Sequence, residues 1–401
     1  MKETYAVIGA GPLGSCAARA LADAFEDENR SAEILLIDAN DPLNQKFDSL
    51  SAAGPHAAGQ LMLHFFDADS SAKDLTRRSH EILKGLNAEG AVDLHSRPWI
   101  CCTGNTNSEL DTTAQEGLAQ SFSEGRLEGC ELVRGEELPG TKGLRADQVA
   151  WALLDPTGMA VNPRVFVQQL AQRAIQHPMI EAHFHTRVTR CSHNTITTEY
   201  DGVTTEGPVT GVILCTGIHR DLFTDALPDG RPEFLHVTEH KEVSHRPEVM
   251  HLISGETTIA RYAGFGPHRE KITPLLPENT QKYGIHGLFT DVPGLRRMLD
   301  SHFENEDLAE SKNDLVWSLL RETIGRYIQP EMLLGHSASN RETNLSYVAA
   351  YNKLLDSDGP YLEQLPVEMP TVHVQPSNGL GLNQCAALGA DAASLLMEVT
   401  G

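Results

Sequence analysis

The sequence predicts an α/β fold with two domains: a Rossmann-like, dinucleotide-binding domain and an α+β domain built on an antiparallel sheet. The first observation is residues 5–24, where an apolar run leads into a glycine-rich turn and then a small-residue segment typical of a helix. The second is an apolar run, Ala32–Asp38, that ends in an acid. The third is a change after Pro228 to short alternating runs, which are typical of antiparallel strands.

The glycine-rich turn carries Gly9, Gly11 and Gly14 in a G-x-G-x-x-G pattern. In this pattern the first glycine permits a tight turn, the second lets a pyrophosphate approach the backbone, and the third lets helix and strand pack closely. The phosphates then meet the free N–H groups at the start of the helix. Asp38 stands where an acid holds a ribose hydroxyl. The order of these elements predicts a dinucleotide site, which we expect to include Pro12, Leu13 and Ala39 as well.

Composition excludes several partners. The 401-residue chain carries a formal net charge of −23, which argues against nucleic acid or an anionic membrane, and its length favours two domains. An anionic substrate would therefore need local Arg or Lys side chains. The seven cysteines show no framework spacing, no apolar run has the length of a membrane helix, and the N-terminal strand leaves no room for a signal peptide. These features favour a cytoplasmic protein.

Two further turns and a small-residue loop offer more places where a backbone can touch a ligand. Residues 48–59 form a small-residue loop with little to bury, consistent with a wall for a flat ligand or with an ordinary surface loop. Residues 209–217 predict a buried strand that ends at Gly217. Residues 371–397 repeat the opening arrangement, because a strand leads through Asn378-Gly-Leu-Gly381 into a small-residue helix over 386–397.

The remaining elements follow from hydrophobic periodicity. Apolar residues at helical spacing predict helices over 72–86, 165–175 and 291–327, the second capped by Asn162 with Pro163 at its first position. Residues 98–103 and 180–188 predict strands, and Asp201-Gly202 predicts a hairpin. We expect a helix with loops in the polar stretch 104–140.

These motifs, in this order, resemble the D-amino-acid-oxidase-like family of FAD-dependent oxidoreductases, of the glycine oxidase and monomeric sarcosine oxidase type. The resemblance implies a fold of the glutathione reductase type, with FAD held by residues 1–89, 150–227 and 365–401. Residues 90–149 and 228–364 would form the substrate domain. Beyond the first turn, the resemblance implies cofactor contacts at Ser51, Ala52, Gly54, Val188, Thr216, Gly217, Asn378, Gly379, Leu380, Gly381 and Leu382.

The resemblance also implies a reaction. The flavin N5 would take a hydride from the carbon beside an amine, water would hydrolyse the imine, and oxygen would reoxidise the flavin. A lysine facing the flavin assists the oxygen step in sarcosine oxidase; Lys271 stands near the corresponding strand, although an exposed loop lysine is equally consistent. Where that enzyme has a carboxylate-binding basic residue, this chain has neutral Asn383. The candidates for the open face of the flavin are Lys271, Arg261, Arg269, Arg341 and Tyr262.

Other functions stay open on the sequence. A hydroxy-acid dehydrogenase on the same fold needs similar geometry for hydride transfer. A flavin monooxygenase of the aromatic hydroxylase type would carry a Gly-Asp pair before its last helix, which this sequence lacks. A nucleotide-binding redox sensor would bind the cofactor without catalysis. We expect no metal site, because His183 and His185 have no third ligand nearby. The sequence does not specify the substrate, the reoxidant or the oligomeric state.

Overall fold

The computed structural model describes most of the first domain and the strands of the second. It describes residues 3–44, 54, 57, 59–63, 70–96, 99–105, 109–125, 127, 129–138, 145–217, 222, 226–227, 230–241, 249–254, 257–262, 280–286, 345–354, 359–376 and 381–401. In the strands between residues 230 and 354 the description covers the backbone alone.

A six-stranded sheet forms the centre of the first domain, in the order β19-β20-β13-β1-β2-β9. Every neighbouring pair of these strands is parallel except β19 and β20. The strands are β1 (Glu3–Ile8), β2 (Ala32–Ile37), β9 (Ile180–His183), β13 (Gly211–Leu214), β19 (Tyr361–Gln364) and β20 (Thr371–Gln375).

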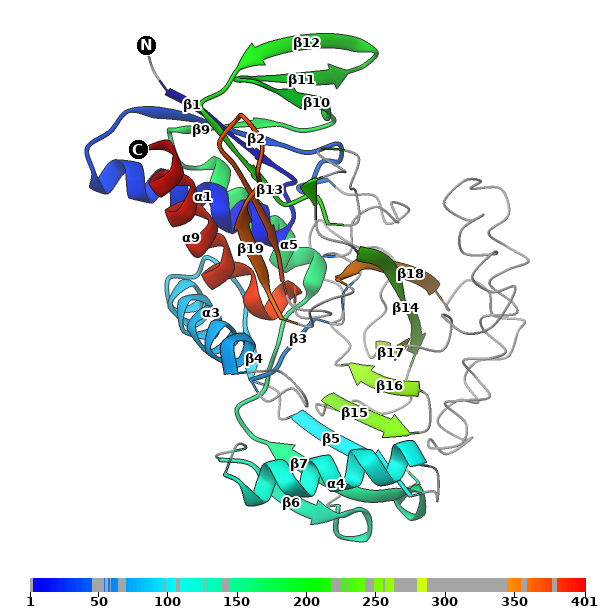
Figure 1. The fold of residues 1–401 in the computed structure, drawn as a ribbon. Coiled ribbons are helices and arrows are strands. Elements are labelled where there is room, and N and C mark those ends of the chain that lie inside the picture. Colours follow the sequence, from blue (N-terminus) through cyan, green and yellow to red (C-terminus); the bar gives the residue numbers. More distant parts are fainter. Residues whose placement is uncertain are drawn as a thin grey trace.

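Four helices accompany this sheet (Figure 1). They are α1 (Pro12–Asp27), α3 (Ser70–Ala88), α5 (Pro163–Ile175) and α9 (Gly381–Thr400). Helix α1 contacts both α5 and α9, and α9 also contacts α3. The side chain of Asn162 caps α5 by accepting hydrogen bonds from the N–H groups of Arg164 and Val165, and Pro163 occupies the first helical position.

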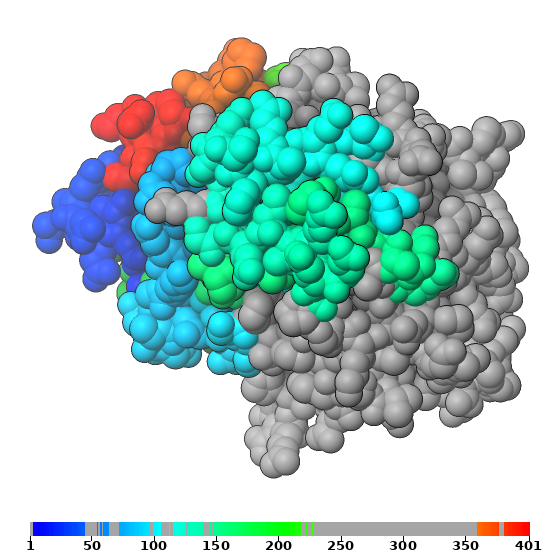
Figure 2. Space-filling view, turned by 90° about the horizontal axis from the view of Figure 1, so that it is seen from below, coloured from blue at the N-terminus to red at the C-terminus, as the bar shows by residue number. Residues whose placement is uncertain are grey.

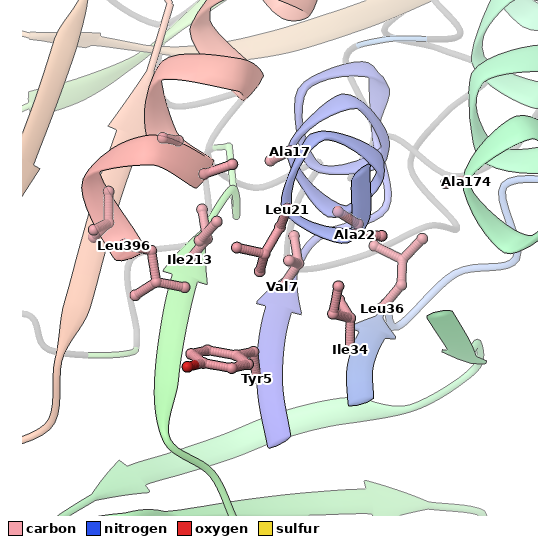
Figure 3. Close-up of a cluster of buried hydrophobic side chains, with 14 of the residues drawn as sticks. Tyr5, Val7, Ala17, Leu21, Ala22, Ile34, Leu36, Ala174, Ile213 and Leu396 are labelled. Carbon is pink, nitrogen blue, oxygen red and sulfur yellow. The ribbon is translucent and has the colours of Figure 1, made fainter. Parts of the chain in front are cut away.

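The core of the first domain lies between the sheet and α1 (Figure 3). Alternate residues of β1 and β2, among them Tyr5, Val7 and Ile34, are fully buried beneath this helix. Small residues let α1 approach α9, since a Cβ at Gly389 would lie 2.8 Å from the backbone nitrogen of Ala17. The small-residue character of both helices therefore serves close contact between them.

An eight-stranded sheet lies in the predicted second domain, in the order β18-β14-β17-β16-β15-β5-β7-β6. Its neighbours are antiparallel except β5 and β15, which are parallel. The strands are β5 (Trp99–Gly104), β6 (Glu131–Arg134), β7 (Val149–Asp155), β14 (Gly230–Lys241), β15 (Val249–Ser254), β16 (Thr257–Tyr262), β17 (Thr280–His286) and β18 (Leu345–Leu354).

Helix α4 (Glu109–Ser123) contacts β5, β7 and β15. Its Leu118 packs with Trp99, Cys101 and Leu153 in a buried cluster. Figure 2 views this part of the molecule from below, where the cyan-to-green atoms of α4 and its neighbouring strands lie together. Two short 3-10 helices, η1 (Gly135–Glu137) and η2 (Ala146–Gln148), complete this region.

Two small sheets complete the described fold. One contains β10 (Arg187–Ser192), β11 (Thr195–Tyr200) and β12 (Val203–Pro208), with the hairpin turn at Asp201-Gly202 as predicted. The other contains β3 (Gln60–Leu61), β8 (Met159–Ala160) and β4 (His95–Ser96), with β8 in the middle. The small sheet of β3, β8 and β4 leads from the first domain into β5 of the second domain.

Three predicted elements differ from the structure. The strand predicted over 180–188 is divided between β9 and β10 in separate sheets, because the chain turns at His185, whose φ is +56°. The polar stretch 104–140 contains β6 in addition to α4. The last helix begins at Gly381, earlier than predicted, since this glycine of the turn already has helical geometry. The helix predicted over 291–327 lies outside the described residues.

The division into two discontinuous domains stays a prediction. The strands of the two large sheets follow the predicted division except at two strands. Strand β7, predicted for the first domain, pairs with β5 and β6 in the second sheet. Strand β19, predicted for the second domain, pairs with β20 in the first sheet.

Candidate cofactor site

The glycine turn joins β1 to α1 at the carboxyl end of the parallel strands, where α/β sheets bind ligands. The N–H of Gly9 donates to the carbonyl of Ile37 over 2.8 Å, and Gly9 has a φ of +102°. A Cβ at Gly9 would collide with the Cys215 carbonyl, and one at Gly14 would collide with the Gly9 carbonyl. At Gly11, in contrast, no described residue beyond the two chain neighbours has an atom within 4 Å of the position of a Cβ. The turn therefore leaves open space at Gly11, where the sequence predicts a pyrophosphate.

The start of α1 offers backbone donors to this space. Gly11 is the residue that precedes the helix and has no side chain to cap it, and Pro12 occupies the first helical position. The first turn of α1 contains no acidic residue. The hydroxyl of Ser15 donates to the carbonyl of Ala10 over 3.0 Å. The positive end of the helix dipole and its free N–H groups therefore suit an anionic group.

Asp38 follows β2 and lies against the glycine turn. Its Oδ2 accepts the N–H of Ala10 over 2.6 Å, and its Oδ1 accepts the N–H of Asn40 over 2.8 Å. Nδ2 of Asn40 also donates to Oδ1, over 3.4 Å. Asp38 is half-buried and Ala39 is exposed. The donors, the open space and the acid together fit a dinucleotide such as FAD.

Gly54 and Leu382 take part in contacts within the protein. A Cβ at Gly54 would lie 2.9 Å from Cδ of Pro12 and 3.2 Å from Cγ2 of Val167, so this loop residue packs against α1 and α5. Leu382, in the first turn of α9, is buried in a cluster that includes Leu61. The structure thus brings Gly54 next to the start of α1.

The other predicted cofactor residues are spread over the first domain. Val188 in β10 is buried with Ile8 and Val212. Thr216 is half-buried and Gly217 is exposed after β13. Gly381 is the first residue of α9. The predicted residues that lie outside the described part of the chain are Ser51, Ala52, Asn378, Gly379 and Leu380.

The catalytic candidates lie in or near the second sheet. Arg261 and Tyr262 are in β16, where Arg261 pairs with Met250 of β15 and with Tyr283 of β17. The backbone alone is described there. Lys271, Arg269 and Arg341 lie outside the described residues. The roles of these side chains stay predictions.

Sequence reasoning missed a buried polar network at the start of α9. Oδ1 of Asn383 accepts the N–H of Met62 over 2.6 Å, and Nδ2 donates to the carbonyl of Gln60 over 3.3 Å. Nε2 of His80, on α3, lies 3.1 Å from the same Oδ1. Burial lowers the pKa of His80 to about 4, so its ring is neutral and donates this bond. Asn383 is 3% exposed and uses its amide within the protein. No local motif signals these contacts, because the partners are distant in sequence.

In the described part of the chain, one group of side chains has residue types that can bind a metal ion, but their contacts are those of ion pairs. It contains Asp23, Glu26 and His177. Nε of Arg19 lies 2.7 Å from Oδ1 of Asp23, so this carboxylate already has a cation. Nδ1 of His177 accepts the N–H of Met179 over 3.3 Å, which places the ring proton on Nε2, facing Glu26 at 3.3 Å.

The fold is an α/β fold with a mostly parallel sheet, and the glycine turn between β1 and α1 fits a dinucleotide. Comparison with sequence families identifies its class. The chain belongs to the DAO family, described as FAD dependent oxidoreductase, whose sequence model matches residues 4–394. The resemblance found in the sequence is therefore confirmed, together with FAD as the cofactor and oxidoreductase as the kind of enzyme. This result replaces the hypothesis of a non-catalytic redox sensor.

Solved structures show the same fold at low sequence identity. Glycine oxidase from Geobacillus kaustophilus is 14% identical, with a TM-score of 0.69 over 99% of this chain and 95% of that chain. L-proline dehydrogenase from P. horikoshii is 14% identical, with a TM-score of 0.66 over 99% and 94%. Iminodiacetate oxidase from Chelativorans sp. BNC1 is 16% identical, with a TM-score of 0.65 over 98% and 95%.

Two other comparisons bear on the chain. No curated protein matches its sequence. Among the described residues, no helix combines the length and the apolar character that crossing a membrane requires.

Proposed function

We propose that this FAD-dependent oxidoreductase oxidises the C–N bond of a small amine or amino acid and that oxygen accepts the electrons. The observation that carries the proposal is the family match across residues 4–394, on a fold whose glycine turn, α1 and Asp38 fit FAD. Glycine oxidase, L-proline dehydrogenase and iminodiacetate oxidase are named for substrates with a nitrogen beside the oxidised carbon, which supports the substrate class.

Bound FAD supplies the acceptor for a hydride, at N5, from the carbon that carries the amine. The substrate loses this hydride and the amine proton, and water converts the resulting imine to a carbonyl compound and an amine or ammonia. Oxygen takes up the two electrons and two protons as hydrogen peroxide.

The chain's own residues position the two reactants in this proposal. The N–H groups at the start of α1 hold the pyrophosphate at Gly11, and Asp38 orients the ribose. The loop that contains Gly54 and the start of α9 would hold the isoalloxazine ring. The second sheet covers the open face, and Arg261 in β16 is placed in that sheet. Because the net charge of −23 repels an anionic substrate at long range, a nearby Arg or Lys must orient its carboxylate.

An anaerobic reduction experiment tests the proposal. The purified protein is mixed without oxygen with a panel that contains glycine, sarcosine, proline, iminodiacetate, D- and L-amino acids, and matched hydroxy acids. We expect an amine to bleach the flavin absorption, with an imine-derived carbonyl as product. Reduction by hydroxy acids alone would replace the proposal with a hydroxy-acid dehydrogenase, and flavin that no amine or hydroxy acid reduces would contradict both.

Admitting oxygen to the reduced protein separates an oxidase from a dehydrogenase. The proposal predicts rapid recovery of the flavin absorption with one hydrogen peroxide per substrate oxidised. Slow recovery in air with rapid recovery on addition of a quinone would make the chain a dehydrogenase, as in the name of the P. horikoshii structure.

A further inference from the structure

Gln60, in the short strand β3, has a buried side-chain amide with no hydrogen-bond partner in the described part of the chain. The residue is 4% exposed, and both Nε2 and Oε1 are unpaired. A glutamine amide offers two N–H donors and a carbonyl acceptor, and burying all of them unpaired disfavours the folded state. An apolar residue would fit such an environment better, so the presence of an amide at this position needs a physical explanation.

The backbone of β3 is held in place on two sides. On one side β3 pairs with β8, where Gln60 lies opposite Ala160, and the N–H of Val161 donates to the carbonyl of Gly59 over 2.6 Å. On the other side Asn383 bonds the Gln60 carbonyl and the Met62 N–H. These bonds fix where the Gln60 side chain leaves the strand, because the strand cannot rotate without breaking them.

The direction of the side chain follows from its neighbours. Leu61 enters the cluster formed with Leu382 on the first domain's side. Met62 and Ala160 enter the cluster of Trp99 on the second domain's side. Because alternate residues of a strand face opposite sides, Gln60 shares the side of Met62 and Ala160. Its amide therefore lies on the side of β3 that faces the second domain, opposite to Leu61 and Leu382, while Asn383 at the start of α9 contacts the Gln60 backbone.

We propose that Gln60 is a ligand-binding residue, whose amide pairs with a planar group that presents an N–H next to a C=O. This inference rests on the proposed function, which places the flavin ring between the Gly54 loop and the start of α9. The pyrimidine edge of the flavin carries such an N–H and C=O pair, and a substrate carboxamide bound on the ring offers the same chemistry. Two parallel bonds to either group satisfy both unpaired atoms of Gln60.

The test compares Gln60→Met, which keeps the length of the side chain and removes its polar atoms, with the wild type. Apoprotein is titrated with FAD, and flavin fluorescence gives the dissociation constant. If the flavin edge is the partner, the dissociation constant rises about tenfold, as expected for the net loss of one to two hydrogen bonds. If the substrate is the partner, FAD affinity stays unchanged, and the substrate dissociation constant from anaerobic flavin reduction rises about tenfold.

The melting temperature of the apoprotein distinguishes a ligand-binding glutamine from a structural one, because the two roles predict different changes in Gln60→Met. Removing an unpaired buried amide leaves the melting temperature of Gln60→Met apoprotein unchanged or higher, whereas a structural glutamine would lower it. The control is Gln169→Met on α5. The amide of Gln169 donates to Oδ2 of Asp93 over 2.9 Å and accepts the Asp93 N–H over 3.1 Å, so this variant melts lower with unchanged FAD affinity.

Two results would overturn the inference, and both can be distinguished from a failure of the proposed function. The inference fails alone if wild type binds FAD and Gln60→Met matches it in FAD affinity and substrate affinity. It also fails if Gln60→Met apoprotein melts lower, as Gln169→Met does, while both affinities are unchanged. A wild-type apoprotein that binds no FAD contradicts the proposed function and removes the ligand on which the inference rests.

Discussion

The backbone N–H of Ala10 donates to Oδ2 of Asp38 over 2.6 Å, so one carboxylate holds the glycine turn against the end of β2. The other oxygen of Asp38 accepts the N–H of Asn40. The acid that is predicted to bind the ribose thus also fixes the backbone that is predicted to bind the pyrophosphate. Loss of this side chain acts on both parts of the cofactor at once.

Replacing Asp38 by Ala is expected to raise the dissociation constant for FAD by about 10- to 100-fold, because a hydrogen bond to the ribose and the position of the turn are lost together. Titration of the apoprotein with FAD measures this change. The control is Asp391→Ala on α9, where Nη1 of Arg78 lies 3.1 Å from the carboxylate, far along the helix from its first turn. That variant is expected to keep wild-type FAD affinity, and equal affinity in Asp38→Ala would contradict the assigned role.

Gly11 and Gly14 are expected to respond differently to an added side chain. Apart from its chain neighbours, no described residue lies within 4 Å of a Cβ at Gly11, so Gly11→Val should leave the melting temperature of the apoprotein nearly unchanged while its side chain excludes the pyrophosphate. The Gly14→Ala methyl collides with the Gly9 carbonyl, so this variant should melt lower even without cofactor. Flavin content and apoprotein melting, measured on both variants, check the prediction. A Gly11→Val protein that purifies with full flavin would contradict it.

His80 is expected to make stability depend on pH. Burial lowers its pKa from 6.5 to about 4, so the unfolded chain binds the proton more tightly than the folded protein. This contribution to stability is fully present above pH 6.5 and is lost as pH falls towards 4, by up to about 3 kcal/mol in total. Urea unfolding between pH 4.5 and 7 measures the loss.

The matched variant is His80→Gln, which keeps an N–H donor for Oδ1 of Asn383 and does not titrate. Its stability is expected to fall less steeply below pH 6.5 than that of wild type. Other titrating groups cancel in the comparison, so parallel curves for the two proteins would mean that His80 is not the cause.

The sequence alone is sufficient to predict the structure where that structure depends on backbone geometry within one motif. Gly9 and Gly14 are glycines because neighbouring carbonyls occupy the space of a Cβ, and the motif signals this requirement locally. The order of strand, turn, helix and acid therefore predicted the first sheet and the position of Asp38. Alternation after residue 228 predicted antiparallel strands for the same local reason.

The sequence was not sufficient where distant segments meet. Asn383 was interpreted as a neutral replacement for a carboxylate-binding residue, whereas its amide bonds Gln60, Met62 and the His80 ring in the folded chain. Neither Gln60 nor His80 belongs to a motif, and their chemistry comes from burial at contacts between β3, α3 and α9. Only a three-dimensional structure brings these residues together.

The arginine candidates lead to a prediction about substrate binding. If the substrate is an amino acid, Arg261→Ala or Arg341→Ala is expected to raise KM by about one to three orders of magnitude, because one or two charge-assisted bonds to its carboxylate are lost. Steady-state kinetics with an amino acid and with the matching amine, which lacks the carboxylate, check the cause. The effect should be confined to the amino acid, and unchanged KM in both variants would exclude an arginine clamp at these positions.

Lys271 leads to a prediction about the oxygen step. An ammonium group near the flavin favours reduction of oxygen, because it stabilises the negative charge that develops on oxygen as electrons arrive. Lys271→Met should therefore slow reoxidation by about tenfold or more, a loss of about 1.4 kcal/mol of transition-state stabilisation, while flavin reduction by substrate stays near the wild-type rate. Stopped-flow measurement of each half-reaction separates the two effects. Lys84→Met, on an exposed position of α3, is the control and should leave both half-reactions unchanged. Normal oxygen reactivity in Lys271→Met would remove this residue from the mechanism, and slowed reduction by substrate would place its charge beside the substrate instead.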